Sequence, residues 1–136
     1  MEYIGACCCG EVQVKLTLPN SLHSYQPRAC DCDFCMAQKT AYLSDLNGVL
    51  EVFHQHKLEG IYQGSEQAIF WQCKACHNLI LVSCEFASGV KGAVNAGVFS
   101  QKYTIGSAVY VSPKMLSPQE KRERWQSVWL TVNFQP

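Results

Sequence analysis

The sequence carries little charge and no charge of one sign in excess. Eleven basic residues balance eleven acidic ones, and charged residues make up 16% of the 136 positions. A protein that attracts nucleic acid or an anionic membrane broadly, in a salt-sensitive way, needs a basic surplus. We therefore expect neither a nucleic-acid partner nor a membrane partner.

Long apolar runs and leader-like segments are also missing. No run reaches the roughly 18 residues that suggest a membrane span. The start, MEYIGACCCG, has neither the basic region nor the apolar region of a signal peptide. We expect a cytoplasmic protein, whose thiols stay reduced. Neither a G-x-S-x-G elbow, a P-loop nor a dinucleotide glycine fingerprint is present, which removes the commonest motif-based enzyme assignments.

Cysteine is what the sequence has in excess. Of the nine cysteines, all but Cys8 and Cys84 fall into three tight clusters: Cys7 and Cys9; Cys30, Cys32 and Cys35; Cys73 and Cys76. Clustered thiols in a reducing compartment are typical of a soft, tetrahedral metal ion such as zinc. A disulfide framework is less favoured, because nine is odd and three cysteines are consecutive. Iron–sulfur clusters and copper(I) also bind thiolates, but two distant pairs suit a closed zinc site best.

The two outer pairs predict a structural zinc site. In an extended or bent strand, Cys7 and Cys9 point to the same side and Cys8 points away. Cys73 and Cys76 have the C-x-x-C spacing of a zinc-binding turn. A metal held by all four would close a long loop of the chain and contribute folding free energy directly.

The central cluster, A-C-D-C-D-F-C, predicts a second zinc of a different kind. Its three thiols, Cys30, Cys32 and Cys35, leave one coordination position open for water or a substrate thiol, as in catalytic zinc sites. We expect these three cysteines to be both ligands and catalytic residues, which brings the expected total to two zinc ions per chain. The alternative is a second closed site, with its fourth ligand drawn from Cys84, His77, Asp31 or Asp33.

The hydrophobic pattern predicts an all-β fold with one short C-terminal helix in a single domain, residues 1–136. Apolar and polar residues alternate from Glu11 to Leu18, as in a half-buried strand. Further short strand-like runs cover Val49 to Phe53, Leu58 to Tyr62, Ala68 to Gln72, Leu79 to Ser83 and Val109 to Ser112. Ser117 to Glu120 reads as a capping box that begins a helix, with Trp125 and Trp129 on one face packing against the sheets.

His54 and His56 form an H-x-H motif that could place both side chains on one strand face. Polar residues surround the motif, and no further ligand lies nearby in the sequence. We therefore expect surface residues rather than metal ligands.

Three blocks of the sequence resemble the glutathione-dependent formaldehyde-activating enzyme family, which includes the centromere-protein V branch. The blocks are G-A-C-C-C-G (Gly5 to Gly10), C-D-C-D-F-C (Cys30 to Cys35) and F-W-Q-C-K-A-C (Phe70 to Cys76). In the family they read G-x-C-x-C-G, C-H-C-x-x-C and F-C-x-x-C-G. His77 stands where the family carries the glycine that follows the last cysteine.

The resemblance implies a fold of small coiled β-sheets, like that of the small Rab-binding zinc protein. It implies that the outer four cysteines hold a structural zinc and that the central three hold a reactive one. The implied activity is that of a carbon–sulfur lyase, which joins glutathione to formaldehyde as S-hydroxymethylglutathione. The cations that could meet the carboxylates of glutathione are Arg28, Lys39, Lys91 and Lys102. The alternative is a non-enzymatic zinc-binding module that docks a protein partner.

Overall fold

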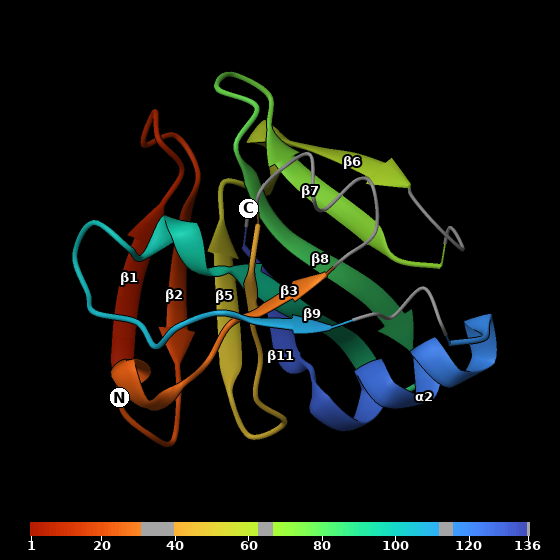
Figure 1. Ribbon diagram of the computed structural model, residues 1–136. Helices are drawn as coiled ribbons and strands as arrows, with labels where there is room; N and C mark the ends of the chain where they lie inside the picture. The colour runs from red at the N-terminus through yellow and green to blue at the C-terminus, as the bar shows by residue number, and fades with distance from the viewer. Residues whose placement is uncertain (31–39, 63–66, 112–115, 136) are drawn as a thin grey trace.

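The computed structural model describes residues 1–30, 40–62, 67–111 and 116–135, and its architecture is mostly β (Figure 1). The elements in chain order are β1 (Glu2–Ala6), β2 (Gln13–Thr17), the 3₁₀ turn η1 (Leu22–Ser24), β3 (Arg28–Cys30), β4 (Tyr42–Leu43), β5 (Val49–Phe53), η2 (Gln55–Lys57), β6 (Leu58–Tyr62), β7 (Ile69–Cys73), β8 (Leu79–Phe86), β9 (Gly89–Asn95), η3 (Ala96–Val98), β10 (Val109–Val111), α2 (Pro118–Val128) and β11 (Leu130–Phe134). The predicted all-β class with one short C-terminal helix is confirmed.

Strand β9 is the branch point of the sheet. One edge of β9 pairs with β8 along its length, while the other pairs with β11 near its start and with β4 near its end. One arm therefore runs β11-β5-β2-β1, a second runs β4-β3-β10, and a third runs β8-β7-β6. Gly92 lies at the branch, where a Cβ atom would come within 2.5 Å of the Val82 carbonyl oxygen. Glycine is needed there because the crossing backbones leave no room for a side chain.

The core forms where apolar residues alternate on the coiled strands. In β2, Val14 and Leu16 are fully buried while Gln13 is exposed, as the period-two pattern predicts. The predicted bounds of β5 and β6 agree with the structure. Strand β8 is buried over its first six residues, from Leu79 to Cys84, because sheet partners flank it on both edges and packing covers its faces.

Helix α2 begins at the predicted capping box. The Ser117 hydroxyl accepts from the Glu120 amide at 3.1 Å, and the Glu120 carboxylate accepts from the Ser117 amide at 2.9 Å. The rings of Trp125 and Trp129 stack with centroids 4.7 Å apart, and Trp129 is buried against the sheet. The packing role predicted for the tryptophans is therefore confirmed. None of the described helices is long and apolar enough to cross a membrane.

Some local predictions were wrong. His54 and His56 do not lie on a strand: His54 has a left-handed backbone at φ 64°, and the 3₁₀ turn η2 follows it. Both side chains are exposed, as expected of surface residues. Strands β1, β3, β4, β9 and β11 were not predicted; β3 and β4 are only three and two residues long, and Gly89 and Gly92 interrupt the pattern of β9.

Candidate metal centre

The first pair of cysteines lies in the turn between β1 and β2. The Gly10 amide donates to the Cys7 carbonyl at 3.0 Å, and the Cys7 amide donates to the Val12 carbonyl at 3.0 Å. Gly10 has φ 79°, a left-handed conformation that glycine adopts without steric cost. We predicted an extended or bent strand for Cys7 to Cys9; the segment is bent, into a tight turn that places both sulfurs on the inner side.

The second pair lies in the turn between β7 and β8. The Cys73 amide donates to the Asn78 carbonyl at 3.0 Å, and the His77 amide donates to the Cys73 carbonyl at 2.9 Å. His77 has φ 59°, a left-handed conformation that glycine adopts without steric cost, and it stands where the family that the sequence resembles carries a glycine. Such a conformation costs a non-glycine residue about 1–2 kcal/mol, which the surrounding hydrogen bonds must offset.

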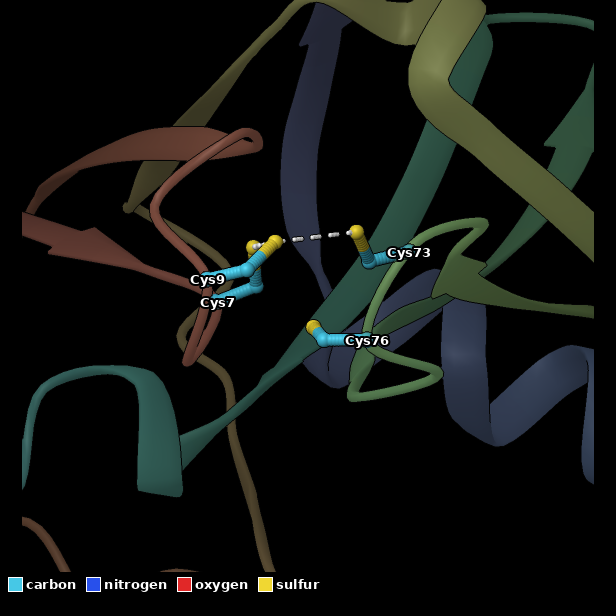
Figure 2. Close-up of side chains that lie close together, drawn as sticks. All are labelled: Cys7, Cys9, Cys73 and Cys76. Carbon is cyan, nitrogen blue, oxygen red and sulfur yellow. Dashed lines mark hydrogen bonds between the residues drawn. The ribbon is translucent and has the colours of Figure 1, made fainter.

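The four sulfurs converge between these two turns, as Figure 2 shows. All of the ligand atoms of Cys7, Cys9, Cys73 and Cys76 lie within 4.8 Å of one another. The Cys7 and Cys9 sulfurs are 3.4 Å apart, and the Cys9 and Cys73 sulfurs are 3.6 Å apart. A disulfide needs about 2.05 Å, whereas sulfurs about 2.3 Å from a tetrahedral zinc lie about 3.8 Å apart. The group therefore fits a metal ion, and its all-thiolate chemistry is compatible with zinc.

The segment around η2 contacts both cysteine turns. The Lys57 ammonium pairs with the Glu11 carboxylate of the first turn at 3.6 Å. The Lys57 carbonyl accepts from the Lys74 amide of the second turn at 3.0 Å. The Lys74 ammonium also donates to the His56 carbonyl at 3.0 Å. We did not predict this role for the segment around η2, because it depends on contacts between residues that lie far apart in the chain.

Hydrogen bonds around the sulfurs shift the pKa values of the clustered thiols in opposite directions. Burial opposes ionisation of Cys76, but the Asn78 amide, the Cys8 thiol and the Cys9 amide together lower its pKa to about 6. At Cys9 the Glu11 amide favours the thiolate, yet hydrogen bonds with neighbouring thiols and desolvation outweigh it and raise the pKa to about 12. The Val12 amide also donates to the Cys7 sulfur at 3.4 Å. Cys76 is therefore the thiol that ionises most readily. A bound cation would displace the protons that the other thiols still carry.

Cys8 is exposed and does not belong to the group of four. It is nonetheless close to the centre, because a hydrogen bond with the Cys76 side chain is the largest cause that raises the pKa of Cys8. Cys8 was predicted to point away from the site; it lies outside the group of four, but its thiol is near enough to Cys76 for each to shift the pKa of the other.

Of the central cluster, only Cys30 lies within the residues that the structure describes. Cys30 is the last residue of β3, while Cys32 and Cys35 lie outside the described residues, together with Asp31 and Asp33. Of the alternative fourth ligands, Cys84 is buried on β8, where its sulfur accepts from the Arg122 guanidinium at 3.2 Å. His77 has an exposed side chain on the turn of the outer site. The second zinc remains a prediction.

No protein-family model matches the chain, and no curated protein matches it either. A solved crystal structure of a Rhodobacter sphaeroides protein is similar, with a TM-score of 0.54 and 22% sequence identity. The match covers 76% of this chain and 99% of that one. At this level of identity the likeness supports the fold alone.

Proposed function

We propose that this protein is a zinc-dependent carbon–sulfur lyase of the glutathione-dependent formaldehyde-activating type. In this proposal the outer cysteines hold a structural zinc, and Cys30, Cys32 and Cys35 hold the reactive one. The substrates are a small thiol such as glutathione and an aldehyde such as formaldehyde.

The observation that carries the proposal is the convergence of two distant sequence blocks. Cys7 and Cys9 of the first block meet Cys73 and Cys76 of the third at metal-binding distances. The resemblance implies this ligand set, and the agreement supports extending it to the central block, which follows β3. His77 departs from the family pattern in residue type, but its left-handed backbone at φ 59° is one that a glycine adopts easily, which is compatible with the resemblance at this position.

The reaction needs a thiolate at neutral pH. Zinc bound by three cysteines supplies a Lewis acid that lowers the pKa of a substrate thiol. The glutathione sulfur attacks the formaldehyde carbon, a carbon–sulfur bond forms, and the carbonyl π electrons move to oxygen, which takes up a proton. The product is S-hydroxymethylglutathione, with no oxidation or reduction.

The first test is the zinc content per chain, with zinc-edge X-ray absorption in the absence and presence of glutathione. We expect two zinc ions, one of which gains a sulfur ligand when glutathione is added. Exchange spectroscopy by NMR should show that the protein accelerates formation of S-hydroxymethylglutathione. Cys32→Ser should abolish this acceleration and remove one zinc while the melting temperature stays close to that of the unmodified protein.

The alternative function, a non-enzymatic zinc module for a protein partner, predicts different results. One zinc per chain, or two zinc ions whose sulfur count is indifferent to glutathione, would favour the module. Unfolding of Cys32→Ser as severe as that of Cys73→Ser would contradict the division into a structural and a reactive site.

A further inference from the structure

A hollow of about 310 Å³ is built by elements other than the two cysteine turns. Its walls come from the segment before β3, from β3 itself, from β4 and its continuation, and from β10. The lining residues that matter here are Tyr25, Arg28, Tyr42, Leu43, Ser44 and Val109. Its volume is at the lower end of the range typical of small-molecule sites.

Three of the lining residues form a row across three neighbouring strands. Arg28 of β3 lies directly opposite Val109 of β10 on one side and opposite Tyr42 of β4 on the other. Directly opposed residues of neighbouring strands project from the same face of a sheet. The Val109 amide donates to the Pro27 carbonyl at 2.8 Å, which fixes β10 beside β3. Sheet register therefore holds the backbone of Arg28 in place.

Arg28 brings a positive charge to this row. Among the lining residues that the structure describes it alone carries a formal charge, and no carboxylate of the described residues forms an ion pair with it. A guanidinium presents a planar fork of donors that matches a carboxylate in a bidentate way.

Asp45, which follows the lining residue Ser44 in the chain, already has hydrogen-bond partners. The Asp45 carboxylate accepts from the Tyr25 hydroxyl at 2.7 Å and from the Asn47 amide at 2.8 Å. Desolvation and the hydrogen bond with Asp45 both raise the pKa of Tyr25, whose hydroxyl is the donor in that bond. These hydrogen bonds hold the Tyr25 side chain in the wall of the hollow. They also occupy the Asp45 carboxylate with donors other than Arg28.

We propose that the pocket around Arg28 binds a carboxylate of the thiol substrate, a small peptide thiol such as glutathione. This inference rests on the proposed function, because it takes the substrate class from there. Arg28 lies two residues before Cys30 on β3, which separates the two Cα atoms by about 7 Å along an extended strand. A tripeptide spans about 10 Å when extended, so one ligand can reach from Arg28 to the start of the central cluster.

S-methylglutathione tests the pocket without the reaction, because its blocked sulfur cannot form a thiolate. Its affinity for the zinc-loaded full chain can be measured by calorimetry, with NMR shifts of the Tyr42 and Val109 amides to locate it. We expect Arg28→Gln to weaken binding about 10- to 100-fold, as loss of a charged hydrogen-bond pair does. Arg28→Lys should lose less, since it keeps the charge but not the fork. Arg124→Gln, which makes the same charge change on α2, should leave the affinity unchanged.

Equal binding by the unmodified protein and Arg28→Gln would overturn the proposal, as would undiminished binding of S-methylglutathione dimethyl ester. Failure to bind S-methylglutathione at millimolar concentration would also overturn it. These outcomes are separable from a failure of the proposed function. If the protein binds S-methylglutathione through Arg28 but does not accelerate thiol–aldehyde addition, the pocket stands and the lyase assignment falls. If the lyase is active but its KM for glutathione is unchanged in Arg28→Gln, the pocket falls alone.

Discussion

The two ends of strand β8 are held by different chemistry. At its start, the turn from Cys73 to Asn78 brings two thiols to the four-cysteine group. At its end, which lies beside α2 in Figure 1, a third thiol is buried and accepts a hydrogen bond from Arg122. Desolvation raises the pKa of this Cys84 thiol in spite of the nearby guanidinium.

The difference shows that the neighbours of a thiol decide its role. A sulfur among three other sulfurs can bind a cation together with them, and the bound cation favours its ionised form. A sulfur enclosed by apolar side chains stays protonated and acts as a packing atom. Arg122 lies over the Phe86 ring at 4.6 Å and joins α2 to β8 through ring and sulfur contacts rather than through metal. We therefore expect metal loss and packing loss to affect the protein in distinguishable ways.

The largest effect should come from removing the metal. Cys73→Ser, or treatment with a strong chelator, should release the zinc of the outer site and unfold the domain. Structural zinc binding is worth about 10–16 kcal/mol in zinc-finger peptides, which is comparable to the whole stability of a typical domain. Zinc content and thermal melting measure the result. Cys8→Ser is the matched control, and if it loses as much zinc as Cys73→Ser, the assignment of the four ligands is wrong.

A smaller effect is expected from the cluster that packs Trp129 and α2 against β8. Trp129→Ala removes a buried ring that stacks on Trp125, and it should cost about 3–5 kcal/mol of unfolding free energy through the cavity it leaves. Denaturant unfolding measures this loss, and the zinc content of the folded protein should be unchanged. Release of zinc from folded Trp129→Ala would mean that this packing and the metal centre are not independent.

The smallest effect should be a pH dependence of the helix. The Ser117 amide donates to the Glu120 carboxylate and lowers its pKa below the ordinary value of 4.5. A depressed folded-state pKa stabilises the fold above the unfolded-state value, and this contribution is lost as the pH falls through the folded-state value. Circular dichroism at 222 nm should therefore show less acid-induced loss in Glu120→Gln than in the unmodified protein. Glu123→Gln, outside the cap, should keep the original pH profile.

Much of the fold could be predicted because its signals are local. The alternation from Val12 to Leu18, the strand at Val49–Phe53 and the capping box at Ser117 each depend on residues within one short segment. Strand β9 escaped prediction because it contains Gly89 and Gly92, and glycine at the branch is required by backbones that come from distant segments. The candidate site was predicted to the level of its ligands. The geometry of its two turns and the contacts of Lys57 with both turns were not predicted, because they depend on hydrogen bonds and an ion pair between distant residues.

The sequence by itself determined which cysteines are paired at metal-binding spacing, because C-x-C and C-x-x-C are properties of neighbouring residues. It also determined the mainly β class and the start of the helix, because these depend on local periodicity and capping. Only the tertiary structure decided that the Cys9 and Cys73 sulfurs lie 3.6 Å apart. It alone decided that Arg28 stands between Val109 and Tyr42. Contacts between residues so far apart in the chain arise from sheet pairing, which no local pattern encodes.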